Sequence, residues 1–319
     1  LEVLGARRVA LRGTDPRRTA ADATALREDA TAAVLGVGVL GEHFAQRVRT
    51  VRHAPELPGG GWLPFPGRRM VALYGHPRSA ALGMLGEQSP AASVRRVRGL
   101  AGQYARLLDE PVVPAFEIIA TVATGSAGAD GTYSQHTARS VLEPWLDAAQ
   151  AAGVYVVLDL QPGRADFLTQ ARAYEALLRR PHVGLALDPE WRLGPGEKPL
   201  HRIGHVAVEE VNRVGQWLAA LVREHDLPPK VLTLHQFRPD MVRERARLDT
   251  TLDEVQWLVH ADGQGGQGAK QATWDAVRRD LPAGVWLGWK NFVDEDAPML
   301  TPAQTVDRVR PTPWFVSYQ

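Results

Sequence analysis

The sequence predicts a (β/α)8 barrel preceded by a small α/β segment at the N-terminus. From residue 69 onward, short runs rich in Val, Leu, Ile and aromatic residues alternate with amphipathic stretches, which is typical of parallel βα units. There are eight such apolar runs, the number that a closed barrel needs. The runs are almost continuously hydrophobic, as expected for strands buried on both faces. An open, doubly wound sheet is the alternative.

The elements follow from this alternation in chain order. The expected strands cover residues 70–74, 112–119, 154–160, 183–187, 230–235, 255–260, 285–289 and 314–318. The expected helices cover residues 93–108, 138–152, 166–178, 208–225, 239–249, 269–280 and 302–308. Ser93 and Thr301 are predicted N-caps, with Pro302 at a first helical position. Gly153 follows a helix directly before a strand, where a left-handed C-terminal cap is expected.

The first part of the chain differs from the rest, and we expect a small α/β segment over residues 1–61 and the barrel over residues 62–319. A strand-like stretch at 7–11 precedes an Ala-rich helical pattern at 19–33, and a Pro- and Gly-rich cluster at 55–61 marks the boundary. Residues 7–20, RRVALRGTDPRRTA, resemble the start of the cell-wall-binding repeats of Gram-positive bacteria, which share a Val-x-x-x-Gly-x-Asp-x-x-x-Thr-Ala pattern. A small cap on the barrel is the alternative interpretation.

Composition excludes several classes of function. The formal net charge is +1, so charge does not point to nucleic acid or an anionic membrane as a partner. The chain has no cysteine, which excludes disulfides, thiolate nucleophiles and cysteine-ligated zinc. No apolar run reaches the roughly 20 residues of a transmembrane segment. The chain starts at Leu1, and we expect a secreted or cell-envelope protein whose signal peptide has been removed.

Polar, ionisable or aromatic residues end every predicted strand, which is where the active site of such a barrel lies. Burial of charged groups there is unfavourable unless they have partners, so we predict a binding site at this end. A Gly-rich loop at 262–268 is not a P-loop and is expected to cover the site or bind an anion, and a loop at 124–133 is expected to shape the cleft. The predicted substrate-binding residues are His76, Glu117, Asp159, Gln161, Arg164, Trp191, His235, Gln236, His260, Trp289, Lys290 and Tyr318.

Three acids are the catalytic candidates. Asp188 and Asp262 end the fourth and sixth strands, and Glu190 is the nearest substitute for either. Each aspartate alternatively caps a following helix or pairs with a basic residue such as Lys290. Trp191 and Trp289 are expected to stack on sugar rings, since the aliphatic face of a pyranose suits an indole.

The barrel resembles glycoside-hydrolase-type TIM barrels in its architecture and in the chemistry of its strand ends. Among these it is most similar to barrels of the α-galactosidase type, which carry carboxylates after strands four and six, as Asp188 and Asp262 do here. The resemblance implies a glycosidase that cleaves an extracellular or cell-envelope polysaccharide with paired carboxylates, a carbohydrate partner, and neither cofactor nor metal.

Two other functions remain open. The first is a metal-dependent hydrolase or phosphodiesterase that uses His76, His235 and His260 with the aspartates, although the His-x-His pair of amidohydrolase-type barrels is missing from the first strand. The second is a barrel that binds carbohydrate without cleaving it.

Overall fold

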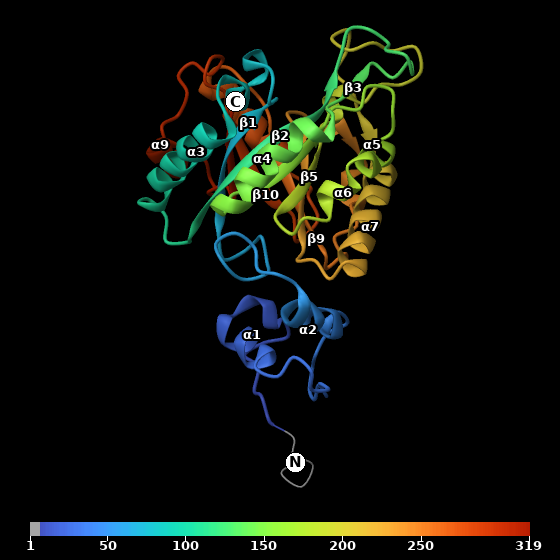
Figure 1. Cartoon of the computed structure of the whole chain (residues 1–319). Helices are drawn as coiled ribbons and strands as arrows, with labels where there is room; N and C mark the ends of the chain where they lie inside the picture. The colour runs from blue at the N-terminus through green and yellow to red at the C-terminus, as the bar shows by residue number, and fades with distance from the viewer. Residues whose placement is uncertain (1–6) are drawn as a thin grey trace.

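Eight parallel strands close into a barrel with helices on its outer face (Figure 1). The computed structural model describes residues 7–319. The first strand, β1, pairs in parallel with both β2 and the last strand, β11, which confirms the closed barrel and excludes the open sheet. The strands are β1 (Arg69–Gly75), β2 (Val112–Ala123), β4 (Tyr155–Leu160), β5 (Val183–Leu187), β7 (Lys230–Gln236), β9 (Val255–Ala261), β10 (Trp286–Asn291) and β11 (Phe315–Tyr318).

The helices of the barrel alternate with its strands as predicted, with differences at their ends. Thr301 caps α9 in a capping box with Gln304, and Gly153 ends α4 at a φ of 64°. The N-cap of α3 is Ser89, not Ser93, because Pro90 at the first helical position starts the helix earlier. No helix within residues 7–319 is long and apolar enough to span a bilayer. The helices are α3 (Pro90–Ala105), α4 (Arg139–Ala152), α5 (Phe167–Ala173), α6 (Glu175–Leu178), α7 (Val208–Glu224), α8 (Gln267–Val277) and α9 (Pro302–Arg308).

One predicted helix, residues 239–249, is wrong. The stretch forms two short 3₁₀ turns on either side of the strand β8 (Val242–Arg243), which pairs in parallel with β6 (Val206–Ala207). Glu244 has a φ of 54°, which a helix does not accept. Pairing with a distant segment therefore outweighs the local helical pattern, and it fastens the loop after β5 to the loop after β7.

A hairpin above the rim was also not predicted. The strand β3 (Ser134–His136) runs antiparallel to the end of β2, so the expected loop at 124–133 is the tip of a β-hairpin (Figure 1). This hairpin makes β2 the longest strand of the barrel.

The interior of the barrel is apolar at the amino ends of the strands and polar at the carboxyl ends. Because side chains alternate between the two faces of a strand, residues two or four positions beyond an inward apolar residue also point inward. On every strand such a residue is polar, and the candidate site is built on this layer. The apolar part consists of Leu57, Phe65, Met70, Ala72, Val113, Ala115, Tyr155, Val157, Ala186, Val231, Leu258 and Phe315.

The N-terminal segment is helical where the structure describes it. It contains α1 (Ala20–Arg27) and α2 (Phe44–His53), the second of which the sequence analysis did not predict. Residues 7–11, predicted as a strand, form none, because no neighbouring strand is there to pair with them. Residues 1–6 of the predicted segment lie outside the described residues. The segment has a small core of its own, made of Ala23, Leu26, Phe44, Val48, Val51, Ala54 and Trp62.

Ion pairs attach this segment beneath the barrel, at the amino ends of the strands (Figure 1). Arg17 Nη2 and Arg47 Nη2 lie 3.0 Å and 2.8 Å from the same oxygen of Asp253, which precedes β9. Arg49 pairs with Asp226, which precedes β7. The segment therefore sits at the end of the barrel opposite the polar layer.

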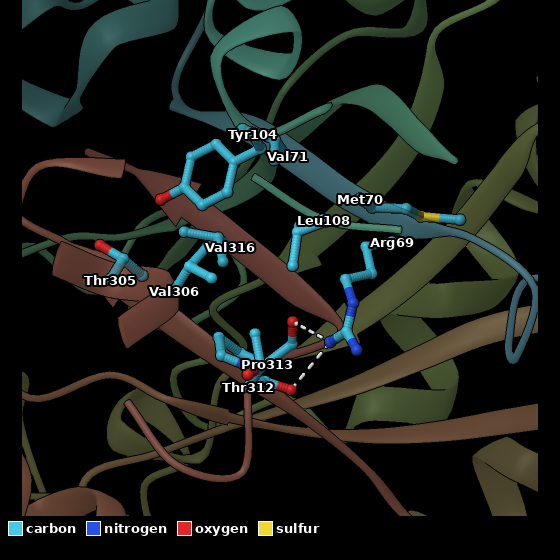
Figure 2. A pocket seen from close by; sticks show the side chains of 10 residues that line it. All are labelled: Arg69, Met70, Val71, Tyr104, Leu108, Thr305, Val306, Thr312, Pro313 and Val316. Atoms are coloured by element: carbon cyan, nitrogen blue, oxygen red, sulfur yellow. Dashed lines mark hydrogen bonds between the residues drawn. The ribbon is translucent and has the colours of Figure 1, made fainter. Parts of the chain in front are cut away.

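A small cavity lies between β1, β11, α3 and α9 (Figure 2). Its volume is about 10 Å³, which is room for one water molecule. Arg69 closes one side by donating to the carbonyl oxygens of Thr312 and Pro313, both at 2.9 Å. The cavity is too small for a sugar, so it is not a candidate site.

Deletion of residues 313–319 is expected to open the barrel. β11 pairs with β10 on one side and β1 on the other, so its loss leaves two unpaired edges and uncovers the inner core at Phe315. We expect aggregation and loss of cooperative unfolding, measured by size-exclusion chromatography and thermal denaturation. Ser317→Ala, which removes one hydroxyl from the same strand, is the control and should stay folded. A truncated chain that remains monomeric and unfolds cooperatively contradicts closure by β11.

Candidate active site

Seven barrel strands each contribute an inward polar side chain near the carboxyl end, the residue directly after β5 contributes an eighth, and these side chains form the floor of the candidate site. Strand pairing sets them at matching heights: Tyr74 lies opposite Glu117. In the same way, His235 lies opposite His260. None of the set is more than 3% exposed. The complete layer consists of Tyr74, Glu117, Asp159, Asp188, His235, His260, Lys290 and Ser317.

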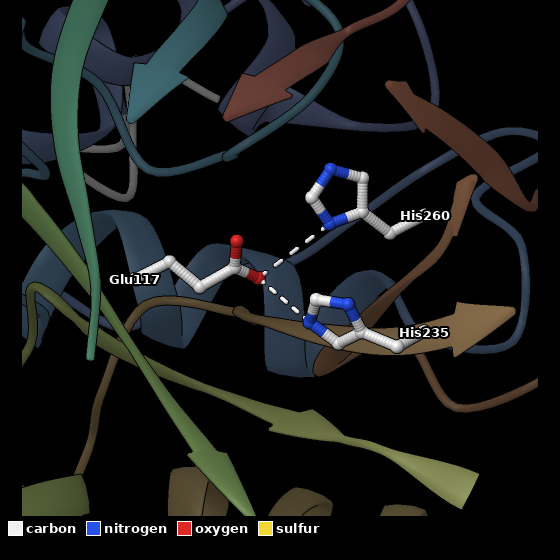
Figure 3. Close-up of side chains that lie close together, drawn as sticks. All are labelled: Glu117, His235 and His260. Carbon is white, nitrogen blue, oxygen red and sulfur yellow. Dashed lines mark hydrogen bonds and ion pairs between the residues drawn. The ribbon is translucent and has the colours of Figure 1, made fainter. Parts of the chain in front are cut away.

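A chain of charged groups crosses this layer from β2 to β10. His235 is central: its Nε2 lies 3.0 Å from Glu117 Oε1, and its Nδ1 lies 2.9 Å from Asp262 Oδ2. The other oxygen of Asp262 lies 3.0 Å from Lys290 Nζ. His260 Nδ1 lies 3.6 Å from the Glu117 oxygen that His235 contacts (Figure 3). Acids and bases alternate along the chain, so each member orients the next.

The members of this chain hold fixed charges at neutral pH. Burial alone would lower the pKa of His235, but Glu117 and the neighbouring aspartates raise it well above its ordinary value. Burial also opposes ionisation of Glu117, yet the two histidines keep its pKa well below its usual range. Despite burial, Lys290 and His235 lower the pKa of Asp262. His235 is therefore a cation between two carboxylates, whereas burial lowers the pKa of His260 and leaves it neutral.

Three further acids lie at the carboxyl ends of the strands, the open end of the barrel that we call the mouth, and their pKa values are raised. Burial raises the pKa of Asp159 to about 6. Burial, and then the charge of Asp159, raise the pKa of Asp188 well above its ordinary value. Glu190 is half-buried, and burial together with the charge of Asp262 raises its pKa to about 7. The mouth thus combines carboxyl groups that hold a proton near neutrality with carboxylates that stay ionised.

Tyr74 joins Asp159 to the chain. Its hydroxyl donates to Asp159 Oδ2 at 2.8 Å, and Lys290 Nζ lies 3.5 Å from the centroid of its ring, within the range of a cation–π contact. Within residues 7–319, the second oxygens of Asp159 and Glu117 are buried without a hydrogen-bond partner. Two acceptors at the floor are therefore free for the hydroxyl groups of a ligand.

Asp188 and Glu190 belong to one short turn after β5. Asp188 Oδ1 accepts the N–H of Glu190 at 3.1 Å and so caps the 3₁₀ turn Pro189–Trp191. The cap fixes the backbone of Glu190, and the residue itself is half-buried. Trp191 is half-buried next to it. Asp188 is thus the cap that the sequence analysis left open as an alternative, and it positions Glu190.

Four other predicted binding residues hold the loops around the mouth. His76 is half-buried, with Nε2 3.0 Å from the hydroxyl of Thr137. Gln161 accepts a backbone N–H at the end of β2, and Arg164 donates to a carbonyl in the loop after β5. Gln236 donates to two carbonyl groups of the loop after β7. These contacts shape the rim.

Two predicted rim residues lie behind the site instead. Trp289 is 1% exposed, belongs to the main core and donates to Asn291 Oδ1 at 2.9 Å. Tyr318 is 3% exposed, and its hydroxyl lies 2.6 Å from that of Tyr104. Each is next to an inward residue on its strand, so each faces outward to the helices. Contrary to the expectation from the sequence, neither reaches the mouth.

Tyr74 and Ser317 belong to the polar layer but were not predicted. Ser317 Oγ lies 3.2 Å from His260 Nε2 and orients that ring. The alternation of side chains along a strand could have predicted both. Tyr74 lies four residues after the inward Met70, and Ser317 lies two residues after the inward Phe315, so both face inward. The sequence analysis gave weight to the last residue of each strand and not to this period.

Lys270 and Asp296 hold the Gly-rich loop after β9 in place. Lys270 Nζ lies 2.8 Å from Asp296 Oδ2, and Asp296 Oδ1 accepts the N–H of Gly265 at 3.0 Å. The same lysine donates to the carbonyl oxygens of Gly263 and Lys290, each at 2.8 Å. The loop is therefore tied to β10, the strand that supplies the ammonium group of the site.

A metal ion is the alternative occupant to test. The ligand atoms of Glu117, His235 and His260 lie within 4.8 Å of one another. His76, which the metal hypothesis also used, is bonded to Thr137 at the rim and is not in this group. In the described structure the two nitrogens of His235 are already occupied, since Nε2 lies 3.0 Å from Glu117 and Nδ1 lies 2.9 Å from Asp262, so an ion between the histidines would have to displace the contact with Glu117.

Elemental analysis of protein purified without added metal is expected to find no stoichiometric zinc, manganese or iron. The reason is that Glu117 and His235 already contact each other at 3.0 Å, so these two groups have a partner without an ion. An ion present at one equivalent, and lost together with activity in His260→Ala, would contradict this and make the metal-dependent hydrolase the leading function.

No protein-family model matches the chain, and none of the curated proteins compared with it matches either. Any inference about function therefore rests on the barrel fold and on the residues at the carboxyl ends of its strands. Barrels of this fold are commonly enzymes, and their active sites lie at the end where the polar layer is found here. The fold is compatible with hydrolase activity.

Proposed function

We propose that this protein is a glycoside hydrolase that acts on an extracellular or cell-envelope polysaccharide. Glu190 is the general acid, and Asp262 is the ionised carboxylate opposite it. The main support for the proposal is that the pKa values of these two acids shift in opposite directions: the pKa of Glu190 is raised to about 7, whereas that of Asp262 is lowered. Glycosidases need such a pair, one acid to protonate the leaving oxygen and one carboxylate to act on the sugar.

Glu190 suits the acid role by its position as well as by its charge. Its side chain is half-buried at the rim, where the glycosidic oxygen of a bound chain would lie. Burial and the nearby charge of Asp262 raise its pKa to about 7, so a substantial fraction is protonated at neutral pH, and a pKa near the working pH is the most effective for proton transfer. Asp188, which the sequence analysis favoured as a catalytic acid, acts as a positioning residue because its carboxyl group caps the turn that carries Glu190.

Asp262 suits the second role because it cannot take up a proton at neutral pH. Lys290 and His235 hold it as a carboxylate from two sides at 3.0 Å and 2.9 Å. In a retaining reaction this carboxylate attacks the anomeric carbon as the glycosidic bond breaks, and in an inverting reaction it takes a proton from the attacking water. The two carboxyl groups lie about 5–5.5 Å apart in the first class and about 6.5–9.5 Å apart in the second, so the anomer released first identifies the class.

The rest of the mouth suits a sugar. The free oxygens of Glu117 and Asp159 are acceptors for ring hydroxyl groups, and the ammonium group of Lys290 is a donor near them. Trp191 is half-buried beside Glu190 and offers an indole face for stacking. The extracellular or envelope location rests on the resemblance of residues 7–20 to cell-wall-binding repeats.

The test is a screen of purified cell-wall polysaccharides for release of reducing ends by the full chain. Release is expected for one class of glycan, unaffected by a metal chelator and abolished in Glu190→Gln. Release that stops with the chelator indicates the metal-dependent hydrolase. Saturable binding of a glycan without release indicates the non-catalytic barrel, and either result overturns the proposal.

A further inference from the structure

A second cavity lies beside the proposed active site, between the loops that follow β5 and β7. Its volume is about 350 Å³, large enough for a substituent of a bound sugar. Its walls are connected to the catalytic loop, since Gly204 donates its N–H to the carbonyl oxygen of Glu190 at 2.6 Å. The pairing of β6 with β8 closes the other side. The cavity is lined by Arg202, Ile203, Gly204, His205, Arg238, Asp240, Met241 and Arg243.

The charges of this lining are unbalanced. Three guanidinium groups line the cavity with one carboxylate, that of Asp240. Arg238 uses this carboxylate in a bidentate pair at 3.0 Å and 2.6 Å, and Arg202 pairs with Glu197 outside the cavity. Within residues 7–319, Arg243 has no ion-pair partner, although it lies at the paired end of β8. Strand pairing fixes the backbone of Arg243, and its exposed side chain carries an unmatched charge that can bind an oxyanion.

His205 lines the same cavity as these arginines. It is half-buried in the cavity wall, and its backbone N–H donates to the carbonyl oxygen of Arg192 at 3.1 Å. Burial lowers the pKa of its imidazole, the charges of Arg243 and Arg202 lower it further, and those of Glu197 and Asp240 act in the opposite direction. His205 is therefore close enough to the arginines to respond to a ligand that binds them.

We propose that this cavity, the arginine pocket, binds a carboxylate or phosphate group carried by the glycan, and that the substrate is therefore an acidic polysaccharide. The inference rests on the proposed function, because it places the group on the chain that Glu190 cleaves. The hydrogen bond between Gly204 and Glu190 connects the two, so an anchored substituent sets which glycosidic bond meets the acid. Specificity for charge then comes from the arginine pocket, and bond cleavage comes from Glu190 and Asp262.

The test measures binding without turnover. Polygalacturonate, a carboxylate polymer, and a poly(glycerol phosphate) are titrated separately into the full chain at fixed low salt, together with neutral dextran. We expect binding of at least one anionic polymer and none of dextran. Arg243→Ala should weaken that binding about tenfold, the loss expected for one charge-assisted contact. The polymer that binds more tightly identifies the oxyanion.

The matched control is Arg95→Ala, which removes the same charge from the exposed side of α3, on another part of the barrel. It should bind as the unmodified protein does. Equal weakening by Arg95→Ala and Arg243→Ala means a general effect of charge and overturns the pocket. So does unchanged binding in Arg243→Ala.

His205 gives a second measurement within the same titration. Its imidazole NMR signals, identified by their loss in His205→Gln, should shift with anionic polymer in the unmodified protein and not with dextran. Arg243-dependent binding with no cleavage of any glycan supports the pocket and contradicts the glycosidase. Cleavage of an acidic glycan at an unchanged rate in Arg243→Ala supports the glycosidase and contradicts the pocket.

Discussion

Glu190→Gln is expected to lower the rate of polysaccharide cleavage by about 10²–10⁴, the range for loss of a general acid. Glutamine keeps the shape of the side chain but cannot donate a proton to the leaving oxygen. An aryl glycoside with an acidic phenol as leaving group needs no such proton, so its cleavage should fall far less. The ratio of the two losses, measured on the same preparation, separates an acid from a residue that only binds.

The pH profile gives a second test of Glu190. Its raised pKa, about 7, means that cleavage should fall as the pH rises above neutrality, when the carboxyl group loses its proton. This alkaline fall should be absent for the aryl glycoside in Glu190→Gln. Glu224→Gln, at the exposed end of α7, is the control and should leave both rate and profile unchanged. An unchanged alkaline limb in Glu190→Gln assigns the acid role to another residue.

Asp262→Asn is expected to abolish cleavage and to destabilise the fold. The substitution removes the carboxylate that acts on the sugar, and it leaves the cations His235 and Lys290 buried without their partner. Removal of one member of a buried ion pair costs about 3–5 kcal/mol of unfolding free energy. Chemical denaturation measures this loss. Asp262→Asn/Lys290→Met, which removes the opposite charge as well, should recover part of the stability but none of the activity.

The stability difference between Asp262→Asn and the unmodified protein should depend on pH. The pKa of Asp262 in the folded chain lies below its ordinary value of 3.8, so the stabilisation is complete above that value and is lost as the pH falls below it. The two proteins should therefore converge in acid. A difference of less than about 1 kcal/mol at pH 7 would contradict the buried ion pairs.

The barrel and the polar carboxyl ends of its strands were predictable from the sequence because both depend on patterns within single strands. Apolar runs of the right length occur eight times, and each is followed by polar residues. The direction of individual side chains was harder to predict. In a sheet buried on both faces, neighbours such as Trp289 and Lys290 are equally buried, so hydrophobicity does not show which one points inward.

Contacts between distant segments account for most of the remaining errors. The stretch 239–249 has a helical pattern, but β8 pairs with β6, which lies more than thirty residues earlier in the chain. The raised pKa of Glu190 depends on burial and then on the charge of Asp262, which follows a different strand. Neither the pairing of β6 with β8 nor the pKa of Glu190 can be predicted from the residue pattern of a single segment.

The N-terminal segment and the candidate site lie at opposite ends of the barrel. Asp253 and Asp226, which receive its arginines, precede β9 and β7 at the foot of the barrel, whereas Glu190 and the arginine pocket lie above the opposite ends of the strands. A surface or partner that grips residues 7–61 holds the barrel by its base and leaves the mouth pointing outward. If the proposed function is correct, changes in the rim loops should alter which polymer is bound, and changes in the segment should alter attachment, because the two lie at opposite ends of the barrel.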